Sequence, residues 1–400
     1  MGSPARGWWG VWAVLAVVVI AYIDRVNMAV MVVDPAFLEH FGLAGDRAGQ
    51  GALMTAFLLG YGVAAIGLTP LLESRFGYRA GLLFSVVAWA LLTACVPWAS
   101  GLGLLLLLRV LLGVAEGPLF SLKTMLIADG FAAGQRGKPN AVSSMGVSIG
   151  LAAGYPLMAA WLQQWGWQGA FYGLGLLNAV LGVGLVLAFV PAPQQQPIRA
   201  QRPGPWQLLC QALGMPHLAG VLLVEICTLA YLWGSTAWLP AYLMHDKGFS
   251  LKAMGMFSAL PFLFALASNG LGGWLADRLG PLRAAWVFVA GGLLCALCVW
   301  QLTGSQGNAA TLAWLLAAAC AWGVQGAAIP TLVQHLAAPG QVGSAYGWVN
   351  GIGNLVAAGM PVAMGSLMGQ YVAAGFVLLI AAQLLSAAGG GWLVWRLRRR

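Results

Sequence analysis

The sequence predicts an all-α membrane protein with about twelve transmembrane helices in two six-helix bundles. Three observations predict it: an apolar composition, regularly spaced apolar stretches and a repeat at half the chain length. Of the 400 residues, 7% are charged and 60% are hydrophobic. This balance excludes a soluble fold of this size and is typical of integral membrane proteins.

The apolar stretches are each about 20 residues long, which is the length that a helix needs to cross a bilayer. We expect them at 8–33, 49–72, 80–97, 102–127, 140–162, 170–190, 217–243, 252–276, 283–302, 309–332, 341–364 and 371–395. The first stretch contains Asp24, Arg25 and Asn27. A cleavable signal peptide does not carry such polar groups, so we interpret this stretch as a retained helix.

Residues 191–215 interrupt this pattern because they are polar and rich in proline. They predict a cytoplasmic linker between an N-terminal bundle, 1–190, and a C-terminal bundle, 216–400. Similar short charged loops surround Gly77 and Gly280, about half a chain length apart. A repeat at half length predicts two similar bundles with a ligand site between them at mid-membrane.

The formal net charge of +9 comes from Lys and Arg residues that lie mostly in alternate loops and in the basic C-terminal tail. This asymmetry follows the positive-inside rule and predicts that both termini are cytoplasmic. We expect a multi-pass protein of a bacterial-type inner membrane, whose tail contacts anionic lipid headgroups. The charge does not imply a nucleic-acid partner.

Metal and cofactor sites are not indicated. The six cysteines are scattered, and Cys295 and Cys298 form a CxxC inside an apolar stretch, where packing is the simpler interpretation. The four histidines fall at expected helix ends and loops. We therefore expect no cofactor, with H⁺ as the coupling ion.

Arg109, Glu116 and Lys123 lie seven residues apart in one apolar stretch. A step of seven turns an α-helix through about 700°, so the three side chains project from nearly the same face. Ionised groups inside a membrane segment are costly and usually functional. Lys123 approaches the cytoplasmic end, where gating or packing is the expected role.

Helix rise places Asp24 and Arg109 at similar depths, with Glu116 about 10 Å deeper. We therefore expect Asp24 to pair with Arg109, which leaves Arg25 for a substrate carboxylate. The reverse assignment stays open, because Asp24 and Arg25 point about 100° apart on their helix. Two acids with different neighbours can hold different protonation states, as proton coupling requires. The alternative is a salt-bridge network that only fixes helix packing.

Other polar residues in apolar stretches are weaker candidates. Tyr22 and Tyr61 in the first half, and Gln325, Asn350 and Asn354 in the second, either line a substrate cavity or bond neighbouring helices. Asn350 and Asn354 are four apart and share a helix face. Glu225 is a further intramembrane acid, nearer the cytoplasmic end.

Two motifs resemble the anion:cation symporter family of the major facilitator superfamily. Tyr22-Ile-Asp24-Arg25-Val-Asn27 is similar to its Y-x-D-R-x-N, and the segment from Arg109 to Gly117 is similar to its R-x-x-x-G-x-x-E-G. The loop at 273–283 resembles the superfamily's G-x-x-x-D-R-x-G-R/K. There, the resemblance implies that Asp277 and Arg278 act as a gating loop.

The resemblance implies the major facilitator fold and H⁺-coupled import of an organic anion. It assigns proton coupling to Asp24 and Glu116, and carboxylate binding to Arg25. It also implies that Arg109 partners an acid, and that Tyr22, Tyr61 and one of Asn350 or Asn354 contact the substrate. Val147 stands where some sugar-acid members carry Gln, which favours a smaller or more apolar carboxylate.

Two other functions remain open at this stage. An H⁺-antiporting exporter of a drug or metabolite could use the same acids, although it has little use for an unpaired Arg25. An integral-membrane enzyme is disfavoured, because no metal cluster, nucleophile motif or large extramembrane domain is evident. We expect a transporter that functions as a monomer.

Overall fold

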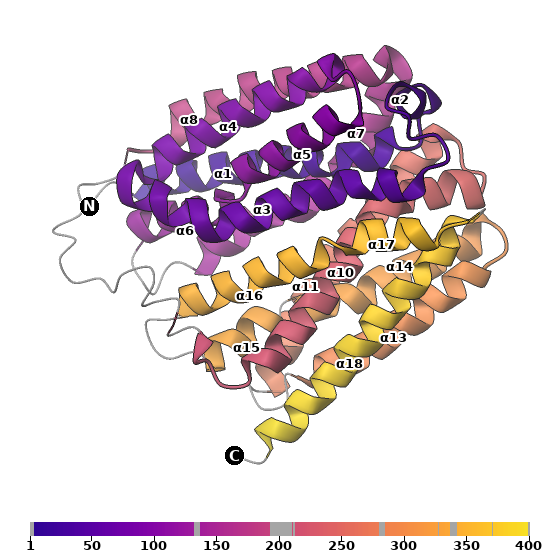
Figure 1. The fold of residues 1–400 in the computed structure, drawn as a ribbon. Helices are drawn as coiled ribbons and strands as arrows, with labels where there is room; N and C mark the ends of the chain where they lie inside the picture. Colours follow the sequence, from indigo (N-terminus) through magenta and orange to yellow (C-terminus); the bar gives the residue numbers. More distant parts are fainter. Residues whose placement is uncertain are drawn as a thin grey trace. The chain divides into compact units, whose positions relative to one another are not determined.

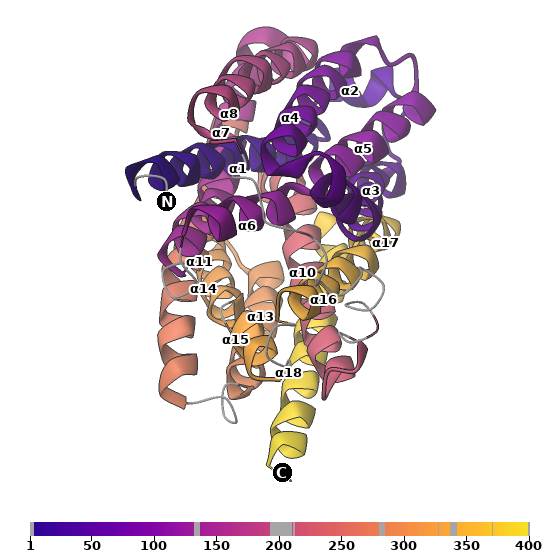
Figure 2. The same cartoon turned by 90° about the vertical axis from the view of Figure 1, so that its left-hand side faces the viewer.

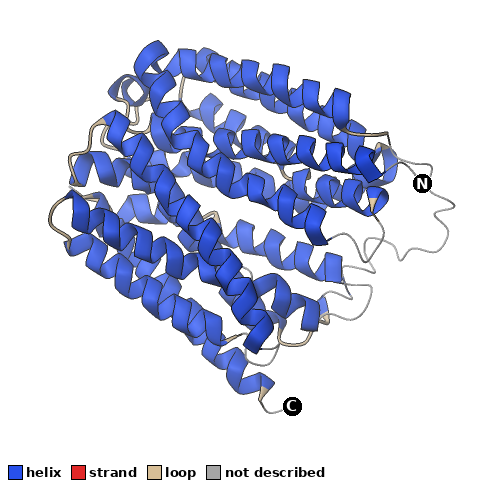
Figure 3. Cartoon of the chain, turned by 180° about the vertical axis from the view of Figure 1, so that it is seen from behind, coloured by secondary structure: helices blue, strands red, loops and turns tan. Residues whose placement is uncertain are grey.

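A computed structural model describes residues 4–131, 137–192, 210, 213–279, 285–326, 328–336, 342–369 and 371–398. Within these ranges every regular element is helical and no strand occurs (Figure 3). By internal contacts the chain divides into two compact units. The N-terminal unit is 1–46 and 52–202, and the C-terminal unit is 47–51 and 203–400. Most of the predicted linker lies outside the described residues, so its boundaries stay predictions.

The helices of the first half form most of the N-terminal unit (Figure 1). They are α1 (Pro4–Met31), α2 (Pro35–His40), α3 (Arg47–Arg75), α4 (Gly77–Cys95), η1 (Val96–Trp98), α5 (Leu102–Glu116), α6 (Leu119–Gly130), α7 (Gly137–Leu177), the π-helix η3 (Asn178–Gly182) and α8 (Val183–Phe189).

The helices of the second half form the C-terminal unit. They are α10 (Leu218–Ala241), the π-helix η5 (Tyr242–Asp246), α11 (Leu251–Leu279), α13 (Trp286–Gly304), α14 (Asn308–Gly326), α15 (Ala328–Leu336), α16 (Val342–Ala357), α17 (Met360–Leu367), η6 (Val372–Phe376) and α18 (Val377–Leu397). Helix α10 packs against both α16 and α18 (Figure 2).

Ten helical segments of the described chain are long and apolar enough to cross a membrane. One of them, Val142–Phe189, spans 48 residues. It holds two crossings, because Gly166 breaks the helix with a φ of 68°. The broken pair α16 and α17 is a further apolar helical segment. With the second crossing in Val142–Phe189 and the α16–α17 pair, the described segments agree with the sequence prediction of about twelve transmembrane helices.

The predicted span 102–127 is interrupted: α5 ends at Glu116 and α6 begins at Leu119. The break falls at Gly117 and Pro118, and proline cannot donate the backbone hydrogen bond that a continuous helix needs. Glu116 therefore occupies the last turn of a helix and not its middle.

Glycines set the closest helix contacts of the N-terminal unit. A Cβ at Gly113 on α5 would lie 2.0 Å from the carbonyl oxygen of Phe57 on α3. A Cβ at Gly150 on α7 would lie 2.6 Å from both Tyr22 Cβ and Val19 O on α1. Small residues at such crossings let helix backbones approach closely in membranes. They bring α5 close to α3 and α7 close to α1.

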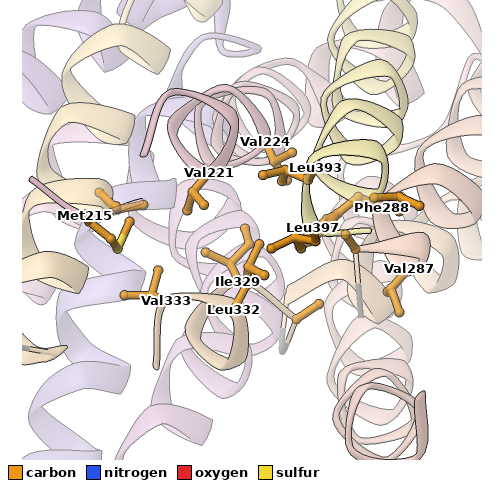
Figure 4. Close-up of a cluster of buried hydrophobic side chains, with 14 of the residues drawn as sticks. Met215, Val221, Val224, Val287, Phe288, Ile329, Leu332, Val333, Leu393 and Leu397 are labelled. Atoms are coloured by element: carbon orange, nitrogen blue, oxygen red, sulfur yellow. The ribbon is translucent and has the colours of Figure 1, made fainter. Parts of the chain in front are cut away.

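An apolar cluster closes one end of the C-terminal unit (Figure 4). It draws Val221 and Val224 from α10, Phe288 from α13, Ile329 from α15 and Leu393 from α18. These side chains are almost fully buried. The cluster fixes the end of α10 that carries Glu225.

Candidate functional site

Helix α1 places two opposite charges side by side within the N-terminal unit. Asp24 is 0% exposed and Arg25 is 1% exposed. Successive residues on a helix point about 100° apart, so the two side chains meet different neighbours. Arg25 faces α3 and α5, whereas Asp24 faces α4 and η3.

Arg25 forms a buried ion pair with Glu116 of α5. The Arg25 Nε donates to Glu116 Oε2 at 2.8 Å, and the two side chains are 1% and 0% exposed. Helix rise separates their backbones, but side chains on a helix lean toward its N-terminus. Because α1 and α5 run in opposite directions (Figure 1), the two side chains lean toward each other and close the gap.

Three aromatic rings surround the Arg25 guanidinium. Its Cζ lies 4.2 Å from the ring centroid of Tyr22, 4.6 Å from that of Tyr61 and 5.5 Å from that of Phe57. Cation–π attraction strengthens when water is excluded, and both tyrosines are buried. The structure thus brings the predicted residues Tyr22, Arg25, Tyr61 and Glu116 into one cluster, which we call the arginine box.

Arg109 borders the arginine box. Its Nε donates to the backbone oxygen of Leu53 at 3.3 Å, and its Cζ lies 5.0 Å from the Phe57 ring centroid. Arg109 Nη2 and Glu116 Oε1 are buried without a hydrogen-bond partner in the described part of the chain. Buried polar atoms of this kind are uncommon and indicate a site with unused binding capacity.

The predicted pairing of Asp24 with Arg109 is therefore wrong in this structure. Asp24 Oδ1 accepts from Thr93 Oγ1 at 2.8 Å, and Asp24 Oδ2 accepts from Asn178 Nδ2 at 2.6 Å. Equal depth in the bundle was not enough, because direction around the helix decides which neighbour a side chain meets. Neutral donors hold Asp24, and the ion pair goes to Arg25 and Glu116.

Thr93 and Asn178 were missed by the sequence analysis. Asn178 is 0% exposed and opens the π-helix η3. Single π-helical turns occur often at functional sites, since they turn side chains out of regular register. The sequence does show a single asparagine in the apolar stretch 170–190. Its role becomes clear only when the structure shows that it faces Asp24.

Lys123 lies apart from the arginine box, on α6. Its Nζ donates to Ser144 Oγ of α7 at 3.0 Å and lies 4.8 Å from the Phe120 ring centroid. The Lys123 side chain is 4% exposed. No ion pair to Lys123 occurs among the residues described. Its expected gating or packing role stays a prediction.

The C-terminal unit holds a chain of neutral and acidic groups. Asn350 Nδ2 donates to Glu225 Oε1 at 3.0 Å, and Asn354 Nδ2 donates to Asn350 Oδ1 at 3.2 Å. Trp233 Nε1 donates to Asn354 Oδ1 at 2.8 Å. The shared face of Asn350 and Asn354 on α16 is confirmed. Their predicted contact with substrate stays a prediction.

Gln325 is occupied by helix packing. Its Nε2 donates to Gln383 Oε1 of α18 at 2.8 Å, and its Oε1 accepts from Ser386 Oγ at 3.1 Å. All three side chains are 0% exposed. This geometry matches the helix-bonding alternative, and a substrate contact by Gln325 stays a prediction. Asp277 and Arg278 lie in the last turn of α11, and their side chains are outside the described part.

A metal centre finds no support in the part of the chain that the structure describes. No three His, Cys, Asp or Glu side chains there gather as potential ligands. The expectation of a proton as the coupling ion stays a prediction.

The family model "Major Facilitator Superfamily" matches residues 14–361. A probable L-galactonate transporter of Escherichia coli K12 is 28% identical, over 69% of this chain and 64% of the relative. A probable sulfoacetate transporter of Cupriavidus necator is 30% identical, over 69% and 68%. A D-galactonate transporter of Escherichia coli O6:H1 is 27% identical, over 93% and 91%.

A solved structure shares the fold. A bacterial homologue of the human lysosomal transporter Spinster superposes with a TM-score of 0.82 and 17% identity, covering 100% of this chain and 98% of that one. At this identity the likeness establishes architecture alone. The predicted all-α membrane fold is confirmed.

Proposed function

The chain belongs to the Major Facilitator Superfamily and is a multi-pass membrane transporter, not an enzyme; we propose that it imports small organic anions together with protons. The observation that carries the proposal is the buried ion pair of Arg25 and Glu116 inside the arginine box. The relatives named for galactonate and sulfoacetate support an anionic substrate.

Glu116 occupies Arg25 as a substrate carboxylate would. A guanidinium binds a carboxylate through charge-assisted hydrogen bonds, and a carboxylate of the protein and one of the substrate compete for the same donors. Protonation of Glu116 removes its charge and weakens its hold on Arg25. A substrate carboxylate can then take the Arg25 Nε–H, so that proton and anion load together.

Charge balance favours the same coupling. With all four groups ionised, Arg25 and Arg109 offset Asp24 and Glu116, and the buried cluster is neutral. A substrate anion alone would leave an uncompensated charge in a low-dielectric site, which is costly. One proton entering with one anion keeps the cluster neutral. Arg109, with its Nη2 unbonded in the described structure, provides a second donor to the incoming anion.

The substrate we propose is a small carboxylate. The rings of Tyr22, Tyr61 and Phe57 line three sides of Arg25 and leave apolar walls near the charge. Val147 offers no hydrogen bond where some sugar-acid transporters of the resembling family carry an amide. Apolar walls with few polar groups suit a compact anion better than one rich in hydroxyls.

Asp24 remains in the proposal as a second proton carrier. Thr93 and Asn178 stabilise its ionised form without an opposite charge. A buried carboxylate held by neutral donors can take up a proton without breaking an ion pair. Asp24 would therefore respond to protons independently of substrate, whereas Glu116 responds to both.

The remaining features of the proposal concern orientation and assembly. We place the chain in a bacterial-type inner membrane with both termini cytoplasmic, since basic residues concentrate in alternate loops and in the tail. We further propose that a monomer is the functional unit, because paired bundles are sufficient for alternating access in this class of fold.

Proteoliposomes with an inward proton gradient test the proposal. Wild-type protein should accumulate a small carboxylate against its concentration gradient, and a protonophore should abolish the accumulation. Glu116→Gln should lose accumulation but keep exchange of internal for external anion, because it mimics the protonated state. Glu39→Gln makes the same change at an exposed acid and should behave as wild type.

Two outcomes would overturn the proposal. Wild-type protein that drives anion out of the vesicles under the inward proton gradient would be an exporter by antiport. Glu116→Gln that accumulates anion as well as wild type would remove Glu116 from the coupling.

A further inference from the structure

Glu225 is a buried acid that the proposed mechanism does not use. It lies on α10 in the C-terminal unit and is 4% exposed. An acid embedded in a membrane is costly to keep ionised, and such residues are usually paired or functional. Among the described residues Glu225 forms no ion pair. Its hydrogen-bond donor in the described structure is the neutral amide of Asn350.

The helices around Glu225 contribute few charges. Helices α14, α16 and α17 contain no Asp, Glu, Lys, Arg or His, and Glu225 is the one such residue within α10. The other elements that contact α10 carry His245, Asp246, Lys252, Asp277, Arg278, His335 and Arg396. Asp277, Arg278 and His335 have side chains outside the described part.

None of these charged groups forms an ion pair or a hydrogen bond with Glu225 in the described structure. His245 and Asp246 follow α10 at its opposite end, Lys252 is at the start of α11, and Arg396 is in the last turn of α18. The other titratable groups along these helices near Glu225 in sequence or register are Tyr346 of α16, Cys227 of α10 and His217 at the N-cap of α10. Among the residues whose side chains are described, the packing therefore supplies no counter-ion to Glu225.

The hydrogen-bond chain beyond Glu225 can serve both of its protonation states. Asn350, Asn354 and Trp233 continue from Glu225 in sequence of donor and acceptor. Each asparagine amide has both a donor and an acceptor group. When Glu225 is ionised, Asn350 donates to it. When Glu225 is protonated on Oε2, its Oε1 can still accept from Asn350, so the chain keeps its direction.

Helix α16 packs closely against the Glu225 side chain. A Cβ at Gly353 would lie 2.8 Å from Glu225 Cγ, so the absence of a side chain at Gly353 leaves space for the acid. At Gly347 on the same helix, a Cβ would meet nothing within 4 Å. The site therefore has space for the Glu225 side chain and a chain of neutral hydrogen-bond donors beside it.

We propose that Glu225 is a proton-binding site of the C-terminal unit that loads and releases one proton in each transport cycle. It raises the number of protons that move with each anion. The inference rests on the proposed proton-coupled import, but it concerns a separate site. Neutral donors and the lack of several oxygen ligands favour a proton over a metal cation at Glu225.

The test measures coupling ratio and not rate. Proteoliposomes containing the full chain, at zero membrane potential, are brought to equilibrium with sulfoacetate, or with galactonate if sulfoacetate is not accumulated, across a series of pH gradients. The slope of log anion accumulation against the pH difference gives the protons moved per anion. Loss of one coupled proton lowers accumulation by about tenfold for each pH unit of gradient.

Glu225→Gln should retain uptake with the slope reduced by one. Glu225→Asp should keep the wild-type slope, because it restores a titratable group. Ser386→Ala removes a buried hydroxyl elsewhere in the same unit and should also keep the wild-type slope. Gly353→Ala should perturb coupling, whereas Gly347→Ala on the same helix should not.

The outcomes separate this inference from the proposed function. Wild-type protein that accumulates neither anion under the proton gradient contradicts the proposed function itself. A wild-type slope in Glu225→Gln contradicts the role of Glu225 alone. If Glu225→Gln is inactive, Glu225→Asp decides: activity with the wild-type slope supports a proton site, and inactivity or an altered slope overturns it.

Discussion

The two units bury their polar groups in different ways. The N-terminal unit buries Asp24, Arg25, Arg109, Glu116 and Lys123, and its one described ion pair joins Arg25 to Glu116. In the described part of the C-terminal unit, Glu225 is the one charged side chain that is buried, and neutral amides form the connections.

The difference separates two ways of handling charge inside a membrane. A buried ion pair is neutral as a whole but costly to break, because each partner alone is an uncompensated charge. An acid held by amides keeps its neighbours when it gains a proton. The first arrangement suits competition with a charged substrate, and the second suits proton uptake that does not depend on substrate.

Breaking the ion pair should give the largest effect. Arg25→Met should lower the free energy of unfolding in detergent by about 3–5 kcal/mol, because Glu116 is left buried without its partner. The double variant Arg25→Met/Glu116→Leu should recover most of this loss. A single variant as stable as the double variant would show that the pair is not energetically coupled.

Removing a neutral hydrogen-bond donor should destabilise the protein less than breaking the ion pair does, and by a similar amount in the two units. Asn178→Leu removes a donor to Asp24, and Asn350→Leu removes the donor to Glu225. Each should cost about 1.5–3 kcal/mol, the usual range for a hydrogen bond to a charged group. Unfolding of both variants under one detergent condition provides the measurement. If Asn178→Leu lowers the free energy of unfolding and Asn350→Leu does not, the hydrogen bond to Glu225 does not stabilise the protein as the hydrogen bond to Asp24 does.

The sequence was sufficient for the fold because the bilayer imposes simple rules. Helix lengths follow from membrane thickness, and an apolar stretch near 20 residues is hard to mistake. Exceptions arise where local backbone chemistry interrupts a stretch. Gly117 and Pro118 divide α5 from α6, and Asn178 begins a π-helix inside a predicted regular span.

The site was predictable in membership but not in pairing. Periodicity and motif resemblance identified Tyr22, Asp24, Arg25, Arg109 and Glu116, all of which are buried in the N-terminal unit. The expected pairing of Asp24 with Arg109 used only depth along the helix axis, and it left out two properties of helices. Side chains lean toward the helix N-terminus, and neighbouring residues face different helices.

The partners of Asp24 needed information about contacts between distant helices. Thr93 and Asn178 come from α4 and η3, and neither belongs to a motif of its own. An isolated polar residue in an apolar stretch acquires meaning when a charged partner is known to face it. Sequence distance alone could not supply that contact.

Glycine substitution tests whether the arginine box depends on close helix packing. Gly150→Ala places a Cβ 2.6 Å from Tyr22 Cβ, so α7 must move away from α1. Overpacking should cost about 1–3 kcal/mol and reduce anion uptake, because Tyr22 flanks Arg25.

Gly184→Ala in α8 is the matched control, since a Cβ there meets nothing within 4 Å. It should be neutral or stabilise by up to about 1 kcal/mol. Thermal unfolding and uptake assays on both variants provide the measurement. Equal behaviour of the two alanine variants would show that α1 and α7 tolerate separation.

The smallest effect should come from Lys123, a buried cation of α6 that forms no ion pair in the described structure. Its ammonium meets a hydroxyl and an aromatic face. Lys123→Met keeps the length and apolar stem, and should change stability by less than about 1 kcal/mol.

Anion uptake and the proton-to-anion slope should stay near wild type in Lys123→Met, because the neutral charge balance of Arg25, Arg109, Asp24 and Glu116 does not include this residue. A large loss of uptake with normal stability would contradict that balance. It would show that the charged groups needed for transport in the N-terminal unit include Lys123 of α6 as well as those on α1 and α5. The N-terminal unit would then differ from the amide-based C-terminal unit in this lysine as well as in the ion pair.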